Sequence, residues 1–221
     1  MRVFVAILWL LGAGVALAET HRWGFDEDVV GEAPEAFTTA RTGRGAEGKW
    51  IVEAAADAPS APNVVRQTSA DDTNYRFPVL VATAARTTNG TLSVRFKAIS
   101  GRVDQAGGLA WRYVDENNYY VVRANALEDN VVLYKMEDGK RSSLTPKGMP
   151  PRTYGVDHEV PAEEWNTLTV GFEGPLFTVS FNGEELFQVE DRTFTETGRV
   201  GLWTKADSVT VFDDLTLQSE E

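Results

Sequence analysis

The sequence predicts an all-β protein built as a two-sheet antiparallel β-sandwich of the jelly-roll type, and three observations lead to this prediction. Apolar and polar residues alternate over short runs, as in strands with one buried face. The dipeptides Asp138-Gly139 and Asn182-Gly183 lie between such runs, and both central residues of the favoured hairpin turn need positive φ. No convincing amphipathic helix pattern follows residue 18.

The first 18 residues have the features of a secretory signal peptide. Arg2 gives a positive start, Val3–Leu11 an apolar core, and Ala16–Ala18 a small-x-small cleavage site. This apolar run is too short to span a bilayer, and no later run approaches the roughly 20 apolar residues of a spanning helix, so no membrane span is predicted. We therefore predict an exported protein, periplasmic or secreted, with one β-sandwich domain over residues 19–221.

The chain is strongly acidic, with 33 Asp and Glu against 21 Lys and Arg and a net charge of −12 at pH 7. Because such a surface repels the phosphates of nucleic acids, we expect no nucleic-acid partner. The sequence contains no cysteine, which excludes disulfides and thiolate metal sites.

The first third of the chain has the least regular strand pattern. Trp23 and Phe25 alternate in a short strand after the cleavage site, and a loop with Gly31 and Pro34 follows. Further short strands, separated by loops rich in glycine and small residues, are predicted at residues 50–53, 64–67 and 77–81.

From Asn89 onward, turn residues separate alternating runs at the spacing of an all-β sandwich. Asn89-Gly90 is a third candidate turn dipeptide, and four prolines between residues 145 and 164 predict a surface loop there. The runs 200–204 and 209–217, joined by a polar turn, predict a closing β-hairpin with one buried face. The remaining strands are predicted at residues 90–99, 108–113, 119–125, 130–136, 165–172, 176–181 and 184–189.

The closing segment also carries a family resemblance. Gly-Arg-Val-Gly-Leu-Trp-Thr-Lys-Ala-Asp-Ser at residues 198–208, followed by Phe-Asp-Asp-Leu, is similar to the C-terminal end of bacterial concanavalin A-like (laminin-G-like) sandwich proteins, the group that includes 3-keto-disaccharide hydrolase domains. Segments 107–113, 117–123, 133–135 and 165–168 look like strands of the same family. The resemblance implies a concanavalin A-like jelly roll more firmly than it implies any substrate.

Basic residues on several strands are predicted to share the face that does not form the core. Because successive strand residues point to opposite sides, Trp111 and Tyr113 are expected together, opposite Arg112. On the closing segment, Trp203 and Lys205 fall out of phase with the buried apolar residues. The predicted ligand-binding set is Arg95, Arg112, Arg123, Lys135, Trp203 and Lys205.

This set indicates a groove for a glycan. Basic side chains hydrogen-bond sugar hydroxyls and anionic uronate or phosphate groups, and an indole ring stacks on the apolar face of a pyranose. The predicted partner is therefore an oligo- or polysaccharide, anionic glycans included. The alternative is that these are ordinary solvent-facing strand positions, whose Arg and Lys pair with acidic neighbours.

A structural calcium ion is predicted at Asp26 and Asp213, because the first and last strands of such sandwiches commonly lie side by side. Calcium takes several oxygen ligands from carboxylates and backbone carbonyls, and the loop at residues 30–31 offers carbonyls. The alternative is that these aspartates cap strand ends through local hydrogen bonds.

The catalytic residues are not identified by any motif. Glycoside hydrolysis needs two carboxyl groups facing each other, but Asp115-Glu116 and Glu190-Asp191 are adjacent pairs, which suit turns better. Three functions stay open. We favour an exported carbohydrate-binding protein; the resemblance suggests a 3-keto-glycoside lyase or hydrolase; and the third is an envelope protein-protein interaction module.

Overall fold

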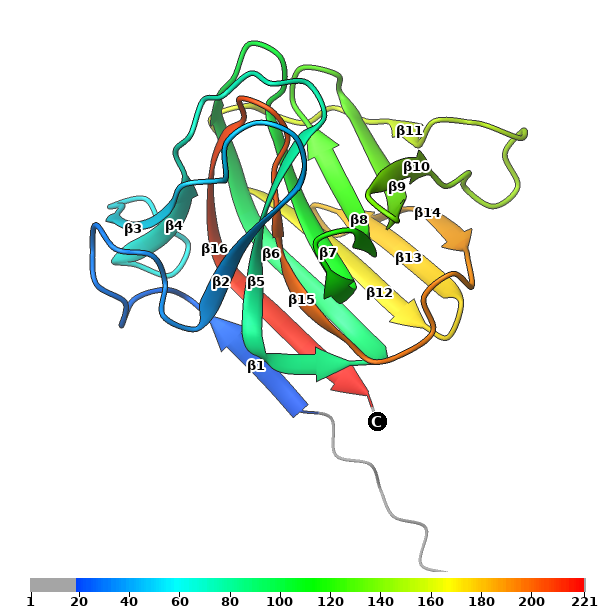
Figure 1. Cartoon of the computed structure of the whole chain (residues 1–221), viewed down its shortest axis with the longest axis horizontal. Helices are drawn as coiled ribbons and strands as arrows, with labels where there is room; N and C mark the ends of the chain where they lie inside the picture. Colours follow the sequence, from blue (N-terminus) through cyan, green and yellow to red (C-terminus); the bar gives the residue numbers. More distant parts are fainter. Residues whose placement is uncertain (1–18, 221) are drawn as a thin grey trace, which may run out of the picture.

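The computed structural model describes residues 19–220 as two antiparallel sheets of eight strands each, packed as a sandwich (Figure 1). The first sheet has the order β14 (Glu184–Glu190), β13 (Leu176–Phe181), β12 (Asn166–Glu173), β6 (Asn89–Ser100), β16 (Val209–Glu220), β4 (Asn63–Gln67), β3 (Trp50–Ala54), with β1 (Glu19–Trp23) paired to β16. The second has the order β10 (Lys140–Ser143), β9 (Asn130–Glu137), β8 (Asn118–Asn125), β7 (Ala106–Asp115), β15 (Gly198–Trp203), β5 (Arg76–Thr87), β2 (Phe37–Gly43), with β11 (Val156–Asp157) paired to β9. The predicted all-β sandwich is confirmed.

The predicted signal peptide at residues 1–18 lies outside the described residues. Within the described part, no helix has the length and apolar character needed to cross a membrane.

The main core lies between the two sheets. In β6, Val94 and Phe96 are fully buried in this core, whereas Ser93 and Arg95 lie on the outer face of the first sheet. β16 pairs with β6 on one side and with β4 and β1 on the other, so the first and last strands are neighbours as expected.

The closing segment does not form the predicted hairpin. β15 pairs with β5 and β7 in the second sheet, whereas β16 pairs with β6 in the first. Residues 204–208 therefore form a crossover between the sheets. The alternation in both strands is the same as in a hairpin, because each strand still has one face toward the common core.

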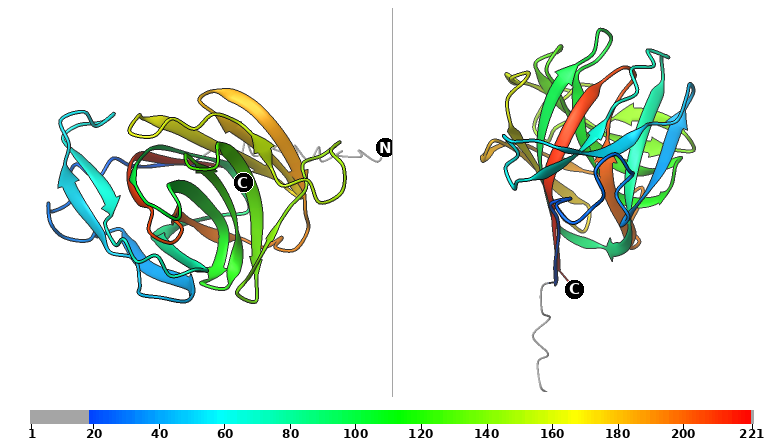
Figure 2. Two further views of the ribbon diagram at one scale, coloured as in Figure 1. Left: turned by 90° about the horizontal axis from the view of Figure 1, so that it is seen from above. Right: turned by 90° about the vertical axis from the view of Figure 1, so that its left-hand side faces the viewer.

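The second sheet curls over its own outer face (Figure 2). Thr42 Oγ1 of β2 lies 2.6 Å from Tyr119 Oη of β8, and Tyr75 Oη donates a hydrogen bond of 3.2 Å to the Gly139 carbonyl. Segments from opposite edges of the sheet thus meet. A second cluster of buried apolar side chains fills the enclosed trough, and it includes Phe77, Val79, Tyr119, Val121, Tyr134 and Trp203. Both faces of this sheet are consequently apolar.

The turn predictions have mixed outcomes. Asp138-Gly139 joins β9 to β10 and Asn182-Gly183 joins β13 to β14, each with two positive φ values, as predicted. Asn89-Gly90 is instead the start of β6. β2 was not predicted, because Phe37–Gly43 is mostly Thr, Ala and Arg and shows no clear alternation.

Candidate functional site

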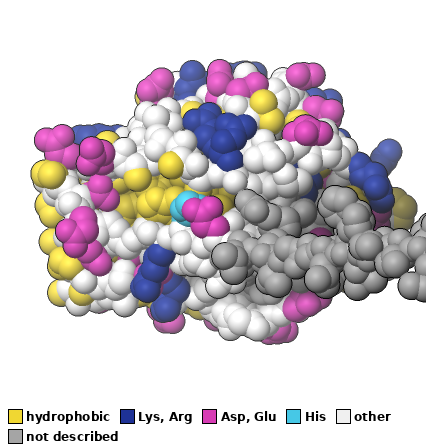
Figure 3. All heavy atoms as spheres, turned by 90° about the horizontal axis from the view of Figure 1, so that it is seen from below, with side chains coloured by type: hydrophobic (Ala, Val, Ile, Leu, Met, Phe, Trp, Pro, Cys, Tyr) yellow, Lys and Arg dark blue, Asp and Glu magenta, His cyan; other side chains and the backbone are white. Residues whose placement is uncertain are grey.

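The six predicted ligand-binding residues do not share one face, so that expectation is wrong. Arg95 lies on the outer face of the first sheet, whereas β7, β8 and β15 belong to the second sheet. On the face seen from below, the basic side chains form separate groups among acidic ones (Figure 3). The four remaining strand residues and Lys205 belong to the second sheet and the crossover that follows it.

Arg112 is a buried structural residue. Pairing of β7 with β8 and of β7 with β15 shifts register around it, and its φ is 46°. This bulge places Trp111 in the main core and Tyr113 in the trough, so the predicted shared face of these two rings is wrong. The Arg112 guanidinium donates hydrogen bonds to three backbone carbonyls, at Thr88, Gly174 and Phe194.

Lys135 faces the inner side of the second sheet. It is paired with Tyr120, whose ring is in the main core, and its Nζ lies 3.2 Å from Glu137 and 3.8 Å from Asp191. Its side chain is 22% exposed and its ammonium reaches these carboxylates, which explains why a lysine is tolerated there.

Trp203 has the predicted phase, but the trough encloses it. The residue has no exposed surface, and its ring stacks on Phe77 with centroids 5.3 Å apart. It therefore offers no ring face to a sugar, and this expectation is wrong.

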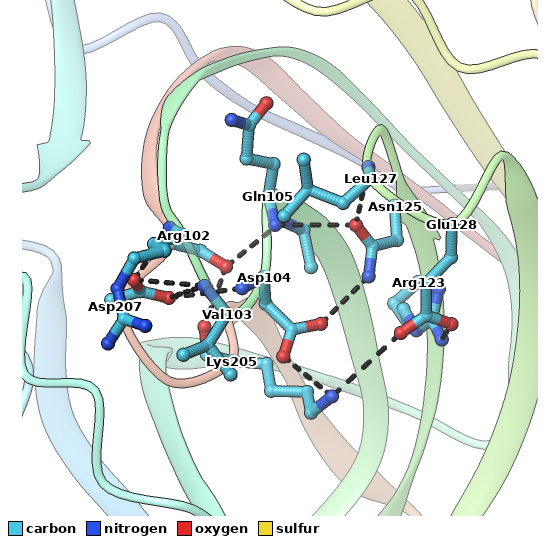
Figure 4. Close-up of polar contacts among 12 residues, drawn as sticks. Arg102, Val103, Asp104, Gln105, Arg123, Asn125, Leu127, Glu128, Lys205 and Asp207 are labelled. Atoms are coloured by element: carbon cyan, nitrogen blue, oxygen red, sulfur yellow. Dashed lines mark hydrogen bonds and ion pairs between the residues drawn. The ribbon is translucent and has the colours of Figure 1, made fainter.

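Arg123 and Lys205 are the two predicted residues that the fold brings together. Two carboxylates complete a charged cluster, defined as Asp104, Arg123, Glu128 and Lys205 (Figure 4). Lys205 Nζ lies 2.6 Å from Asp104 Oδ2 and 4.0 Å from Glu128 Oε1. Arg123 Nη2 donates a 2.7 Å hydrogen bond to Glu128 Oε2.

Three connections between strands position this cluster. Asp104 ends the loop between β6 and β7, Glu128 lies in the turn between β8 and β9, and Lys205 lies on the crossover. Asp207 holds the first loop, because its carboxylate accepts hydrogen bonds from the backbone N–H groups of residues 102, 103 and 104. Asn125 Nδ2 donates to Asp104 Oδ1 at 2.7 Å.

The two carboxylates differ in electrostatic environment. Burial raises the pKa of Asp104, and the hydrogen bond and charge of Lys205 oppose this rise. Burial alone would also raise the pKa of Glu128, but the charge and hydrogen bond of Arg123 hold it below its usual range. Glu128 is therefore a carboxylate that stays ionised near the surface.

Three exposed apolar residues lie next to members of the charged cluster, either in the chain (Val103 and Leu127) or through a hydrogen bond to Arg123 (Tyr154). Val103, Leu127 and Tyr154 are 42%, 48% and 44% exposed, which is unusual for large hydrophobic residues in this structure. The Tyr154 hydroxyl contacts Tyr134 Oη and accepts a 3.2 Å hydrogen bond from Arg123 Nη2, so the ring is held in place.

Sequence reasoning missed Asp104, Glu128 and Tyr154. All three lie in connections, where there is no strand periodicity to indicate which way a side chain points. The only sequence signal was the closeness of Glu128 to Arg123, five residues earlier near the end of β8.

Calcium at Asp26 and Asp213 stays a prediction. Both aspartates contact the same loop: Asp213 accepts hydrogen bonds from Ser60 N at 2.7 Å and Ser60 Oγ at 2.8 Å, and Asp26 accepts one from Asn63 N at 3.0 Å. Asp213 also accepts one from Asp214 N. Within residues 19–220, no group of three or more His, Asp or Glu side chains is arranged to hold a metal ion. Calcium would therefore have to draw on backbone carbonyls and compete with these hydrogen bonds.

The calcium prediction is tested by chelation. If the ion binds, excess EDTA lowers the melting temperature and added calcium restores it, because a ligand present at 100 times its Kd stabilises a protein by about 2.7 kcal/mol. Differential scanning calorimetry with Asp26→Asn as the matched variant measures this. If EDTA leaves the melting temperature unchanged, the predicted calcium site is wrong.

Comparison with known structures supports the fold. The chain is similar to the carbohydrate-binding module CBM66 from Bacillus subtilis, at 20% identity and a TM-score of 0.64, over 83% of this chain and 96% of that one. It is similar to domain 4 of a GH43 extracellular arabinanase from Geobacillus stearothermophilus, in complex with arabinotriose, at 13% identity and a TM-score of 0.56, over 92% and 93% of the two chains.

A Bacillus subtilis protein of unknown function with a galectin-like fold is similar at 10% identity and a TM-score of 0.57, over 92% of this chain and 98% of that one. No protein-family model and no curated protein sequence matches the chain. The fold is thus a concanavalin A-like, galectin-like sandwich.

Proposed function

We propose that the protein is an exported saccharide-binding protein, and that it holds a sugar at the charged cluster. The observation that carries this proposal is the combination of accessible charged groups and exposed apolar side chains at one place. The side chains of Lys205 and Glu128 are 16% and 36% exposed. The exposed Tyr154 bonds Arg123, and the exposed Val103 and Leu127 directly precede Asp104 and Glu128 in the chain.

A sugar matches both halves of this surface. Its hydroxyls are donors and acceptors at once, which suits a lysine beside a carboxylate. Its C–H faces are apolar and pack on aromatic and aliphatic side chains. Two structural neighbours support the proposal, since one is a carbohydrate-binding module and the other is a domain in complex with arabinotriose.

Binding without hydrolysis is favoured by the burial of Asp104. A hydrolase of the usual kind needs two carboxyl groups that both reach the scissile bond. The Asp104 side chain has no exposed surface, and both of its oxygens face protein donors, Asn125 Nδ2 and Lys205 Nζ. Incubation with glycosides and 3-keto-glycosides tests this point. Release of a cleaved sugar product would show that the protein is an enzyme and not only a binding protein.

The Tyr154→Ala variant is the direct test of the site. We expect native affinity gels containing arabinan, inulin, xylan or β-glucan to show retention of the parent protein. The variant should lose about tenfold in affinity for the retained glycan, since a stacked ring contributes about 1.4 kcal/mol. Thermal melting shows whether the variant is folded, because the Tyr154 hydroxyl also bonds Arg123 and contacts Tyr134.

Val114→Ala is the matched control, because Val114 is 56% exposed and lies at the end of β7 opposite to Asp104. If Tyr154→Ala is retained as strongly as the parent protein, the saccharide does not bind at the charged cluster. If no glycan on a broad array is retained and a protein co-purifies instead, the chain is an interaction module.

A further inference from the structure

The charged cluster is electrically balanced within itself. Its two cations and two carboxylates alternate in space, in the order Asp104, Lys205, Glu128 and Arg123, with separations of 2.6, 4.0 and 2.7 Å. An anionic ligand placed against Lys205 would face the carboxylates of Asp104 and Glu128. Like charges at such distances are unfavourable, so the cluster discriminates against anions.

One separation in the cluster is too long for a direct hydrogen bond. Lys205 Nζ and Glu128 Oε1 are 4.0 Å apart, whereas an N–H···O bond spans about 2.7–3.2 Å. Glu128 Oε2 is already used, by Arg123 Nη2 at 2.7 Å and Asn130 Nδ2 at 3.2 Å. Oε1 accepts no hydrogen bond from any described residue, and the Lys205 ammonium has hydrogens left after pairing with Asp104.

We infer that the ligand is an uncharged sugar unit, and that one of its hydroxyls bridges Lys205 Nζ and Glu128 Oε1. A hydroxyl oxygen lying about 2.8 Å from both atoms accepts from the lysine and donates to the carboxylate. A carboxylate or a sulfate has no proton to donate to Glu128. Packing of the sugar's C–H face against Tyr154 accompanies this bond. The inference rests on the proposed function and adds the charge class of the ligand and the atoms that recognise it.

The Glu128→Gln variant tests the bridge. The amide oxygen must face Arg123 and Asn130, which both donate to the carboxylate oxygen Oε2. The amide nitrogen then takes the place of Oε1, and a donor faces the donor Lys205. The hydroxyl loses its acceptor, so we expect affinity to fall about 10- to 100-fold, the range for a hydrogen bond to a charged group.

Glu137→Gln is the matched control, because Glu137 pairs with Lys135 at 3.2 Å on the surface and lies at the other end of β9 from Asn130. This variant should bind like the parent. Circular dichroism and thermal melting show whether Glu128→Gln is folded.

Measurements on the parent protein keep the inference testable if that variant does not fold. The probes are arabinotriose, xylotriose, maltotriose and cellotriose as neutral sugars and trigalacturonate as an anionic one, measured by calorimetry at 50 and 500 mM NaCl. We expect a neutral probe to bind with less than a twofold change between the two salt concentrations, and trigalacturonate to bind at least tenfold more weakly.

Preferential binding of trigalacturonate, weakened by salt, overturns this inference but leaves saccharide binding in place. If a neutral sugar binds Glu128→Gln as tightly as the parent protein, the bridging hydroxyl is likewise overturned and saccharide binding again stays in place. If none of the five probes binds and no array glycan is retained, saccharide binding itself is wrong.

Discussion

Replacing Trp203 with alanine is expected to lower the free energy of unfolding by about 3–5 kcal/mol, the usual cost of removing a large aromatic side chain from a packed core. The indole ring is completely buried and stacked on Phe77. Gly108 lies directly beneath it, because a Cβ there would be 3.3 Å from the ring. Removal of the ring therefore leaves a cavity that rigid neighbours do not refill. Urea denaturation followed by circular dichroism measures the loss.

Trp165→Ala is the matched control, since Trp165 is only partly buried and its ring contacts Lys97 at 5.0 Å. This change should cost much less. The milder Trp203→Phe variant should retain the parent's affinity for glycans. A loss below about 1 kcal/mol in Trp203→Ala would mean that the ring is not packed in the trough.

Replacing Arg112 with alanine is expected to cost about 3 kcal/mol of stability. Its guanidinium donates to the carbonyls of Thr88, Gly174 and Phe194 over distances of 2.6–3.1 Å. The three carbonyls belong to the β5–β6, β12–β13 and β14–β15 connections, so one side chain ties three loops together. The variant leaves these three carbonyls, in part-buried hydrogen bonds, without their donor.

Arg112→Lys should recover only part of this stability, because an ammonium group lacks the planar fork that reaches three acceptors. Arg102→Ala is the control, since the Arg102 side chain is 80% exposed and pairs only with Asp72 on the surface. That change should cost less than about 0.5 kcal/mol. Equal losses in Arg112→Ala and Arg102→Ala would contradict the tying role of Arg112.

The sequence predicts the first sheet well for a physical reason. Its outer face is polar, so strands such as β6 and β12 alternate cleanly between buried and half-buried positions. The turn dipeptide Asn182-Gly183 adds a chain reversal in this sheet, since few residues other than Gly, Asn and Asp adopt positive φ without strain.

The second sheet defeats the same reasoning, because it buries both faces. Alternation assigns Trp203 and Lys135 to a polar face, but the trough and the main core leave no such face in the middle of this sheet. The bulge at Arg112 then reverses the phase of Tyr113. Local sequence carries no signal for curling, which depends on contacts such as Thr42 with Tyr119.

The candidate site was half predictable. Arg123 and Lys205 were selected by strand phase, which applies to Arg123 on β8, whereas Lys205 lies two residues beyond the end of β15. Asp104 and Glu128 are brought to them by a loop and a turn whose geometry depends on Asp207 and Asn125. Pairings of that kind join residues about 20 to 100 positions apart and leave no periodic trace.

The position of Lys205 on the crossover links the proposed saccharide site to the connection between the two sheets. The lysine is placed by a segment anchored in both layers, whereas its partner Glu128 belongs to a hairpin of one layer alone. Their 4.0 Å separation thus depends on the start of the crossover, which follows β15 in the second sheet and continues into β16 of the first. An excised β8–β9 hairpin lacks Lys205, and we expect a circular permutant opened between residues 204 and 208 to lose the proposed site while keeping every strand.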